Sequence, residues 1–151
     1  MIWPAAALEV AGGRLSLSPL PAAEGLAGLA SAGAGCLLSL TEPEEEARAG
    51  LADLGERAAL AGLRHLRLEI RDFDVPQGDC GVLQQALAHL RGGGHLALHC
   101  MGGCGRSGMI ALRLMRMAGE EGQVALARLR AVRPCAIETG AQMAWALAPL
   151  D

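Results

Sequence analysis

Alternating and continuous apolar runs along the chain predict a small set of β-strands. The run HLRLEIR at residues 65–71 places three apolar side chains on one face and charged side chains on the other, which is typical of a half-buried strand. RLSLS at 14–18 alternates in the same way, and the apolar runs at 35–40 and 95–100 have the length of buried strands. We therefore expect four strands.

Segments with helical periodicity lie between and after these strands. Residues 80–91 gather their apolar side chains on one face, and residues 107–119 are mostly apolar, as expected of a buried helix. Thr41 and Glu44 have capping-box spacing, and Pro43 fits the first turn of a helix that starts there. The expected helices cover residues 22–33, 41–62, 80–91, 107–119, 121–132 and 140–150.

Strands that alternate with helices predict an α/β fold, with a central, mostly parallel sheet flanked by helices. The 151 residues suit a single domain, 1–151, and no linker or internal repeat divides the chain. The acidic run at residues 42–46 complements the dipole of the predicted helix 41–62. We interpret this run as a solvated helical turn and not as a patch for a partner.

Composition and charge exclude several functional classes. Apolar residues make up 52% of the chain and charged residues 19%, which is typical of a globular protein and not of a disordered one. A net charge of −3 gives no indication of a nucleic-acid partner. No stretch approaches the ~20 apolar residues that span a bilayer, and the N-terminal residues lack the basic region of a signal peptide. We therefore expect a cytoplasmic protein with no membrane partner.

The five cysteines are odd in number and irregularly spaced. They do not predict a disulfide framework, and we expect a reducing environment. Cys100 and Cys104 are four residues apart and no matching second pair follows, which argues against a zinc site. No metal or other cofactor is expected.

The segment LHCMGGCGRSG, residues 98–108, joins the predicted strand 95–100 to the predicted helix 107–119. Free N–H groups at a helix N-terminus bind anions, and glycines let consecutive N–H groups turn toward one point. Arg106 adds a planar guanidinium suited to two oxygens of one phosphate. The same groups would stabilise a thiolate at Cys100, which makes this side chain a candidate nucleophile facing a bound phosphate.

The sequence HCMGGCGRSG resembles the H-C-x5-R-[S/T] signature of the cysteine-dependent protein tyrosine phosphatases. It is most similar to the small dual-specificity branch, especially the kinase-associated phosphatase type. Asp72 and Pro76 resemble the general-acid loop of this family, in which an Asp is followed four residues later by Pro. The segment AIETGAQMAWAL, residues 136–147, is similar to the family's I-Q-T-x3-Q segment.

The resemblance implies a protein phosphatase that hydrolyses phosphotyrosine, and also phosphoserine or phosphothreonine, in phosphoproteins or phosphopeptides. Cys100 would attack phosphorus to form a cysteinyl-phosphate, and Asp72 would protonate the leaving oxygen and then activate a water molecule. Ser107 would hydrogen-bond the thiolate, and His99 would orient the loop through backbone contacts. Phosphate, sulfate or vanadate would bind to Arg106 and to the N–H groups of the loop residues Met101, Gly102, Gly103, Cys104 and Gly105.

Glu138 stands where the family has the Gln that positions the hydrolytic water. A carboxylate near a thiolate and a phosphate is electrostatically unfavourable. Glu138 therefore either takes the water-positioning role itself or turns away and leaves that role to Gln142.

Other assignments stay open. Asp74 or Asp79 is an alternative general acid, since both follow the same predicted strand. Cys104 is either inert or a redox partner that captures oxidised Cys100 as a disulfide. Arg133 either reaches the rim of the pocket or pairs with the carbonyl end of its own helix.

Three rival functions also remain. One is a non-catalytic phosphate-binding module, and the others are a rhodanese-type sulfurtransferase and a thiol-based arsenate reductase. The loop has no basic residue between Cys100 and Arg106, whereas phosphatases of this family that act on lipids carry lysines there. This difference argues against polyphosphoinositide substrates.

Overall fold

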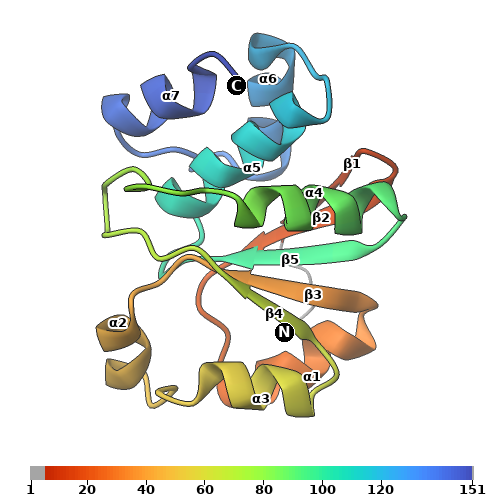
Figure 1. Cartoon of the computed structure of the whole chain (residues 1–151), viewed down its shortest axis with the longest axis vertical. Coiled ribbons are helices and arrows are strands. Elements are labelled where there is room, and N and C mark those ends of the chain that lie inside the picture. The colour runs from red at the N-terminus through yellow and green to blue at the C-terminus, as the bar shows by residue number, and fades with distance from the viewer. Residues whose placement is uncertain (1–5, 151) are drawn as a thin grey trace.

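A computed structural model describes residues 6–150, so the two ends of the predicted domain lie outside the described part. Five strands form one sheet in the order β1-β2-β5-β3-β4 (Figure 1). β1 is antiparallel to β2, and every other neighbouring pair is parallel, as predicted. The strands are β1 (Ala6–Val10), β2 (Gly13–Ser18), β3 (Ala34–Ser39), β4 (Arg64–Arg67) and β5 (His95–His99).

Helices cover both faces of the sheet (Figure 1). On one face, α1 (Ala23–Ser31) and α3 (Leu54–Leu60) pack through a core that includes Leu26, Leu37 and Leu54. The opposite face carries the larger core and four helices: α4 (Val82–Arg91), α5 (Gly105–Met117), α6 (Gly122–Val132) and α7 (Gly140–Leu147). This arrangement confirms the predicted α/β fold.

The first strand, β1, was not among the predicted strands. Its sequence AALEV is rich in alanine, a weak strand former, so the local pattern gives little signal. A tight turn at Ala11 and Gly12, which have φ of 55° and 87°, folds β1 back onto β2. The strand conformation of β1 therefore depends on pairing with β2 and not on the local sequence.

The single helix predicted over 41–62 is wrong, because two short helices occupy this range. The first, α2 (Pro43–Arg48), is followed by Gly50 at φ 76°, and α3 begins four residues later. The capping box is also displaced by one residue: Glu42 N–H donates to Glu45 Oε1 at 2.9 Å, and the side chain of Glu42 receives the return bond. Thr41 instead donates its hydroxyl to Glu46 Oε2 at 2.6 Å.

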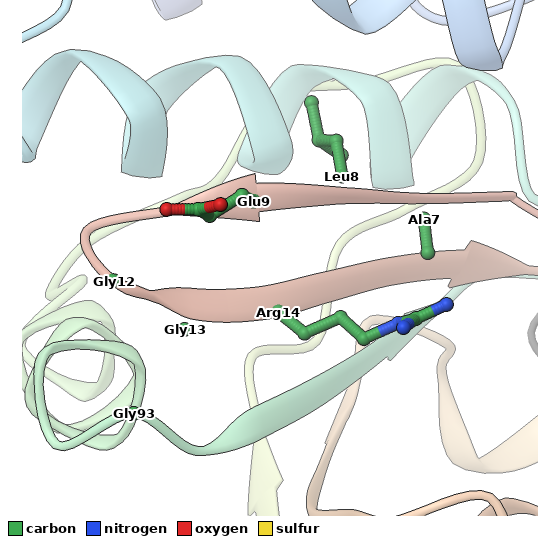
Figure 2. A pocket seen from close by; sticks show the side chains of 7 residues that line it. All are labelled: Ala7, Leu8, Glu9, Gly12, Gly13, Arg14 and Gly93. Atoms are coloured by element: carbon green, nitrogen blue, oxygen red, sulfur yellow. The ribbon is translucent and has the colours of Figure 1, made fainter.

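The register of the parallel strands determines which residues share an edge of the sheet. Arg14 lies beside His95 where β2 and β5 begin, and Ser18 lies beside His99 where they end. A hollow of about 530 Å³ near the β1–β2 turn, with Arg14 among its lining residues, therefore lies at the amino end of β2 (Figure 2). The residues that follow His99 lie at the opposite edge, away from this hollow.

Candidate active site

Residues 100–106, which run from the end of β5 into the first turn of α5, are called the glycine loop below. Gly103 has φ of 74°, and a Cβ there would lie 2.5–2.7 Å from backbone atoms of Ser18 and Pro19, so only glycine fits. The Gly103 N–H donates to Cys100 Sγ at 3.2 Å. Cys100 is 3% exposed. The loop backbone thus directs the N–H group of Gly103 at the sulfur of Cys100.

Arg106 is buried in the first turn of α5, and three of its five N–H groups form hydrogen bonds. Its Nη1 and Nη2 donate to the two carboxylate oxygens of Glu45 at 2.7 and 2.9 Å, and Nη1 also donates to the Ile70 carbonyl at 2.9 Å. Nε has no hydrogen-bond partner among the described residues. A guanidinium has five N–H donors. Nε–H and the second Nη2–H, which lie on the same side of the group, therefore remain for two oxygens of one anion.

Glu45 is the functional residue that the sequence analysis missed. The acidic run was interpreted as a solvated turn, but Glu45 and Glu46 are only 8% and 2% exposed. The hydrogen bond from Arg106 outweighs desolvation and holds the pKa of Glu45 below its usual value. A positional signal existed: carboxyl ends of parallel strands share one edge of the sheet, so residues just after β3 lie near those just after β5.

Asp72 lies next to Arg106, and the two alternative acids do not. Asp72 Oδ1 is 3.4 Å from Arg106 Nη2 and also accepts the N–H of Phe73 at 3.0 Å, and the side chain of Asp72 is 51% exposed. Asp74 Oδ1 instead accepts the N–H of Val75, and Asp79 Oδ1 accepts the N–H of Gly81. These last two carboxylates stabilise turns of their own loop.

His99 connects the glycine loop to the centre of the sheet. Its Nδ1 lies 3.3 Å from the Cys100 carbonyl, which can only accept, so Nδ1 carries the proton. Nε2 then accepts from Ser39 Oγ at 2.6 Å, and Ser39 Oγ accepts from His65 Nε2 at 2.8 Å. Complete burial lowers the pKa of His99 to about 4, so the ring is neutral near pH 7. This chain of hydrogen bonds fixes the carbonyl of Cys100.

Ser107 follows Arg106 in α5 and is fully buried. Its Oγ has no hydrogen-bond partner among residues 6–150. The bond from this hydroxyl to the Cys100 thiolate, which the resemblance implies, therefore stays a prediction.

Gln142 is fully buried, and its side-chain amide already binds backbone groups. Oε1 accepts the N–H groups of Glu138 and Thr139 at 3.0 and 3.3 Å, and Nε2 donates to the Asp74 carbonyl at 3.2 Å. Gln142 thus ties the start of α7 to the loop that carries Asp72. These bonds do not favour a water-positioning role for it.

Glu138 does not turn away from the glycine loop. A Cβ on Gly105 would collide with Glu138 Oε1, so the carboxylate lies directly against the first residue of α5. The partial positive charge at a helix N-terminus stabilises an anion in this position, which offsets repulsion from a thiolate.

The structure also corrects the expectation for the cysteines. Cys104 forms a disulfide with Cys135, 31 residues away, so two of the five cysteines are paired. Cys100 is a free thiol, as are Cys36 and Cys80. The pairing that was left open, between Cys104 and Cys100, is therefore not the one formed. Spacing along the chain gave no indication of Cys135, because the partners meet only through packing of α5 against α6.

Arg133 reaches the glycine loop, which resolves the alternative left open for it. Its Nε donates to the Gly103 carbonyl at 2.9 Å and its Nη2 to the Gly102 carbonyl at 3.0 Å. Within residues 6–150, no group of three or more His, Cys, Asp and Glu side chains is arranged to hold a metal ion. None of the helices in this part of the chain is long and apolar enough to cross a membrane.

Solved phosphatase structures resemble this fold over most of its length. Tk-PTP in its active form is 32% identical, with 93% of this chain and 92% of that chain covered and a TM-score of 0.75. A kinase-associated phosphatase (KAP) with its catalytic-site cysteine substituted by serine is 21% identical, with 88% and 83% covered and a TM-score of 0.80. Human DUSP28 is 25% identical, with 88% and 87% covered and a TM-score of 0.63.

A comparison with curated protein sequences finds no match. The protein family described as "Polymorphic toxin system, DSP-PTPase phosphatase" matches residues 11–120, a range that includes Glu45, Asp72 and the whole glycine loop. The match extends over more than half of the chain. The chain therefore belongs to this family of DSP-PTPase phosphatases.

Proposed function

We propose that this single-domain chain is a cysteine-dependent phosphatase that hydrolyses phosphotyrosine, and also phosphoserine and phosphothreonine, in phosphoproteins. The observation that carries the proposal is the proximity of Asp72 to Arg106. The carboxylate lies 3.4 Å from Nη2, which brings the acid loop to the glycine loop around Cys100. A nucleophile, an anion-binding guanidinium and a proton donor thus meet at one edge of the sheet.

In the first step, the phosphate of the substrate binds to the glycine loop and to the Nε–H and second Nη2–H of Arg106. The Cys100 thiolate attacks phosphorus while the bond from phosphorus to the leaving oxygen breaks. The loop N–H groups and Arg106 stabilise the charge on the three equatorial oxygens. The product of this step is a cysteinyl-phosphate.

Asp72 supplies the proton that the leaving oxygen needs. Bound phosphate would replace Asp72 as the partner of Arg106 Nη2. A phosphate dianion beside the carboxylate also favours its protonated form, because two negative charges repel. The same geometry that pairs Asp72 with Arg106 in the free protein therefore prepares it to donate a proton in the complex.

In the second step, water attacks phosphorus, Asp72 accepts a proton from it, and Cys100 leaves as a thiolate that the Ser107 hydroxyl stabilises. Glu138 is the better candidate to orient this water. Glu138 is exposed, and its carboxylate lies against Gly105. The amide of Gln142, in contrast, already binds backbone groups. Inorganic phosphate is released.

The experiment is turnover of p-nitrophenyl phosphate with and without a chelator, followed by a panel of phosphotyrosine, phosphoserine and phosphothreonine peptides. We expect chelator-resistant hydrolysis of the aryl phosphate and of phosphotyrosine peptides. Thiosulfate and arsenate serve as rival substrates. Turnover of either one without phosphate-ester hydrolysis would favour a sulfurtransferase or an arsenate reductase instead. Phosphate binding without turnover of any substrate would favour a non-catalytic module.

A further inference from the structure

Arg133 binds two carbonyls of the glycine loop, and the N–H group of each of these peptides points away from Arg133. The Gly102 carbonyl belongs to the same peptide group as the Gly103 N–H, which points at Cys100 Sγ. In a trans peptide, C=O and N–H point in opposite directions. Arg133 therefore holds this peptide from behind while its N–H faces the sulfur.

The same reasoning applies to the next peptide. The Gly103 carbonyl accepts from Arg133 Nε at 2.9 Å, so the N–H of Cys104, in the same peptide group, points away from Arg133. Two consecutive N–H groups turned to one side form an anion-binding concavity. One planar guanidinium thus fixes the orientation of two of the donors that would bind phosphate.

The residues after Arg133 bind the glycine loop and so hold Arg133 beside it. Cys135 is bonded to Cys104, and the Ile137 N–H donates to the Cys104 carbonyl at 3.1 Å. Ile137 is a β-branched residue with φ of 68°, a conformation that persists only where the surroundings impose it. Arg130 donates to the Ala136 carbonyl at 3.0 Å and so holds this segment without touching the loop.

We propose that Arg133 is a positioning residue for phosphoryl transfer, which acts by directing the N–H groups of Gly103 and Cys104 toward the bound phosphate. Its positive charge also strengthens both carbonyl bonds and adds to the potential that attracts the anion. The proposal rests on the proposed function, because it assigns a role within the same phosphate site.

The test compares Arg133→Met with Arg130→Met, with the Cys104–Cys135 disulfide intact in both. Methionine keeps most of the aliphatic length but cannot donate. Arg130 is the matched control, since its hydrogen bonds in the described part of the chain go to the carbonyls of Ala136 and Ile137 and not to the glycine loop. Arg133→Lys keeps the charge and loses the planar fork. The readouts are kcat and KM for p-nitrophenyl phosphate, tungstate affinity by calorimetry, and Tm.

A misplacement of about 1 Å at a catalytic group costs on the order of 100-fold in rate. We therefore expect Arg133→Met to lower kcat/KM by about 10- to 100-fold, mostly through kcat, and to weaken tungstate binding by about tenfold. Arg133→Lys should recover part of both losses, and Arg130→Met should stay within about twofold of wild type. Equal losses in the Arg133→Met and Arg130→Met variants would overturn the proposal, because the effect would then be general loosening of the segment. Unchanged kcat and tungstate affinity in Arg133→Met would also overturn it.

Tungstate binding separates this proposal from the proposed function. If the wild type binds tungstate in an Arg133-dependent manner but hydrolyses no phosphate ester, the proposed function fails and the loop-positioning role stands. If the wild type binds no oxyanion at all, the glycine loop is not a phosphate site, and both proposals are contradicted.

Discussion

The carboxylate of Glu45 and the guanidinium of Arg106 bind each other through two parallel hydrogen bonds of 2.7 and 2.9 Å across a separation of 61 residues. Glu45 lies in the short helix α2, and Arg106 lies in the first turn of α5. The pair joins the segment after β3 to the loop after β5. It occupies one edge of the guanidinium and leaves the other edge for an anion.

Glu45→Gln should damage both stability and activity. One amide NH₂ would face an N–H of Arg106, and the buried guanidinium would lose its counter-charge. Removal of one partner of a buried ion pair costs about 3–5 kcal/mol in the free energy of unfolding. Because Arg106 would no longer be held in place, kcat should fall by about tenfold or more. Urea unfolding and aryl phosphate kinetics measure the two effects.

Asp53→Asn is the matched control for this variant. Asp53 pairs with Arg57 at 2.7 Å, but both side chains are more than 40% exposed. An exposed i,i+4 pair contributes little to stability, because water and salt screen the two charges. If Glu45→Gln changed stability and kcat no more than Asp53→Asn does, the Glu45–Arg106 pair would have no special role.

Asp72→Asn should lower kcat by about 10²–10⁴, the range expected for loss of a general acid. Asparagine keeps the size of the side chain but has no proton to give to the leaving oxygen. The pH dependence of kcat/KM should be bell-shaped in the wild type, with a maximum on the acid side of neutrality, and one limb should flatten in the variant. The loss should shrink for substrates whose leaving group is a weak base.

Asp74→Asn and Asp79→Asn change the same loop by the same charge. Within the described residues Asp72 pairs with Arg106, whereas the carboxylates of Asp74 and Asp79 accept backbone N–H groups and form no such pair. Each of these two variants should therefore affect stability more than chemistry. If Asp74→Asn lost the rate expected for Asp72→Asn while Asp72→Asn stayed active, the general acid would be Asp74 and the assignment to Asp72 would be wrong.

The Cys104–Cys135 disulfide joins two residues that are 31 positions apart in the sequence. A loop of this size stabilises the folded state by about 3–4 kcal/mol in the chain-entropy account. Cys135→Ser should therefore lower Tm markedly and remove the effect of a reductant on the wild-type Tm. Cys80→Ser, at a cysteine that is free, should leave the reductant effect intact. A wild-type Tm that does not respond to reductant would contradict this bond.

Acidification should destabilise the protein in the range where free histidine gains a proton. Burial lowers the pKa of His99 from 6.5 to about 4. The unfolded chain therefore binds a proton below about pH 6.5 while the folded state does not until about pH 4, so stability falls as the pH falls through this window. His99 alone should contribute a loss of about 2 kcal/mol between pH 7 and pH 5. His65 and His95, whose pKa values are also lowered by burial, add to this loss in the same direction.

Glu45 adds to the loss only at lower pH. Its pKa is below its ordinary value of 4.5 when folded, so its stabilisation is present above that value and disappears as the pH falls further. Urea unfolding between pH 7 and pH 4.5 isolates the histidine contribution. A flat free energy of unfolding over that interval would mean that His99 is not held neutral.

The parts of this protein that depend on local sequence could be predicted. Alternation predicted β2 and β4, and continuous apolar runs predicted β3 and β5. The glycine loop was identified because strand, glycines and helix follow each other within a dozen residues. The proline and glycine signals around 41–62 were present too. They were given less weight than helical periodicity, and Gly50 at φ 76° divides that range into two helices.

The parts that depend on contacts distant in sequence could not be predicted in the same way. Glu45 is chemically one of several acidic residues in a row, and only the approach of α2 to α5 selects it as the partner of Arg106. Cys135 and Arg133 meet the glycine loop only because α6 packs beside α5. Ser39 and His65, which hold His99, lie on strands that become neighbours through parallel pairing.

The most direct measurement of the central claim is the detection of phosphate on Cys100 during turnover. Acid quench of the enzyme within the first turnover of p-nitrophenyl phosphate, followed by mass spectrometry of the glycine-loop peptide, should find one phosphoryl group on the Cys100 sulfur. Cys100→Ser should show no such adduct and no turnover, and should still bind tungstate. Steady hydrolysis by Cys100→Ser, or turnover by the wild type with phosphate on another residue or on none, would contradict the account.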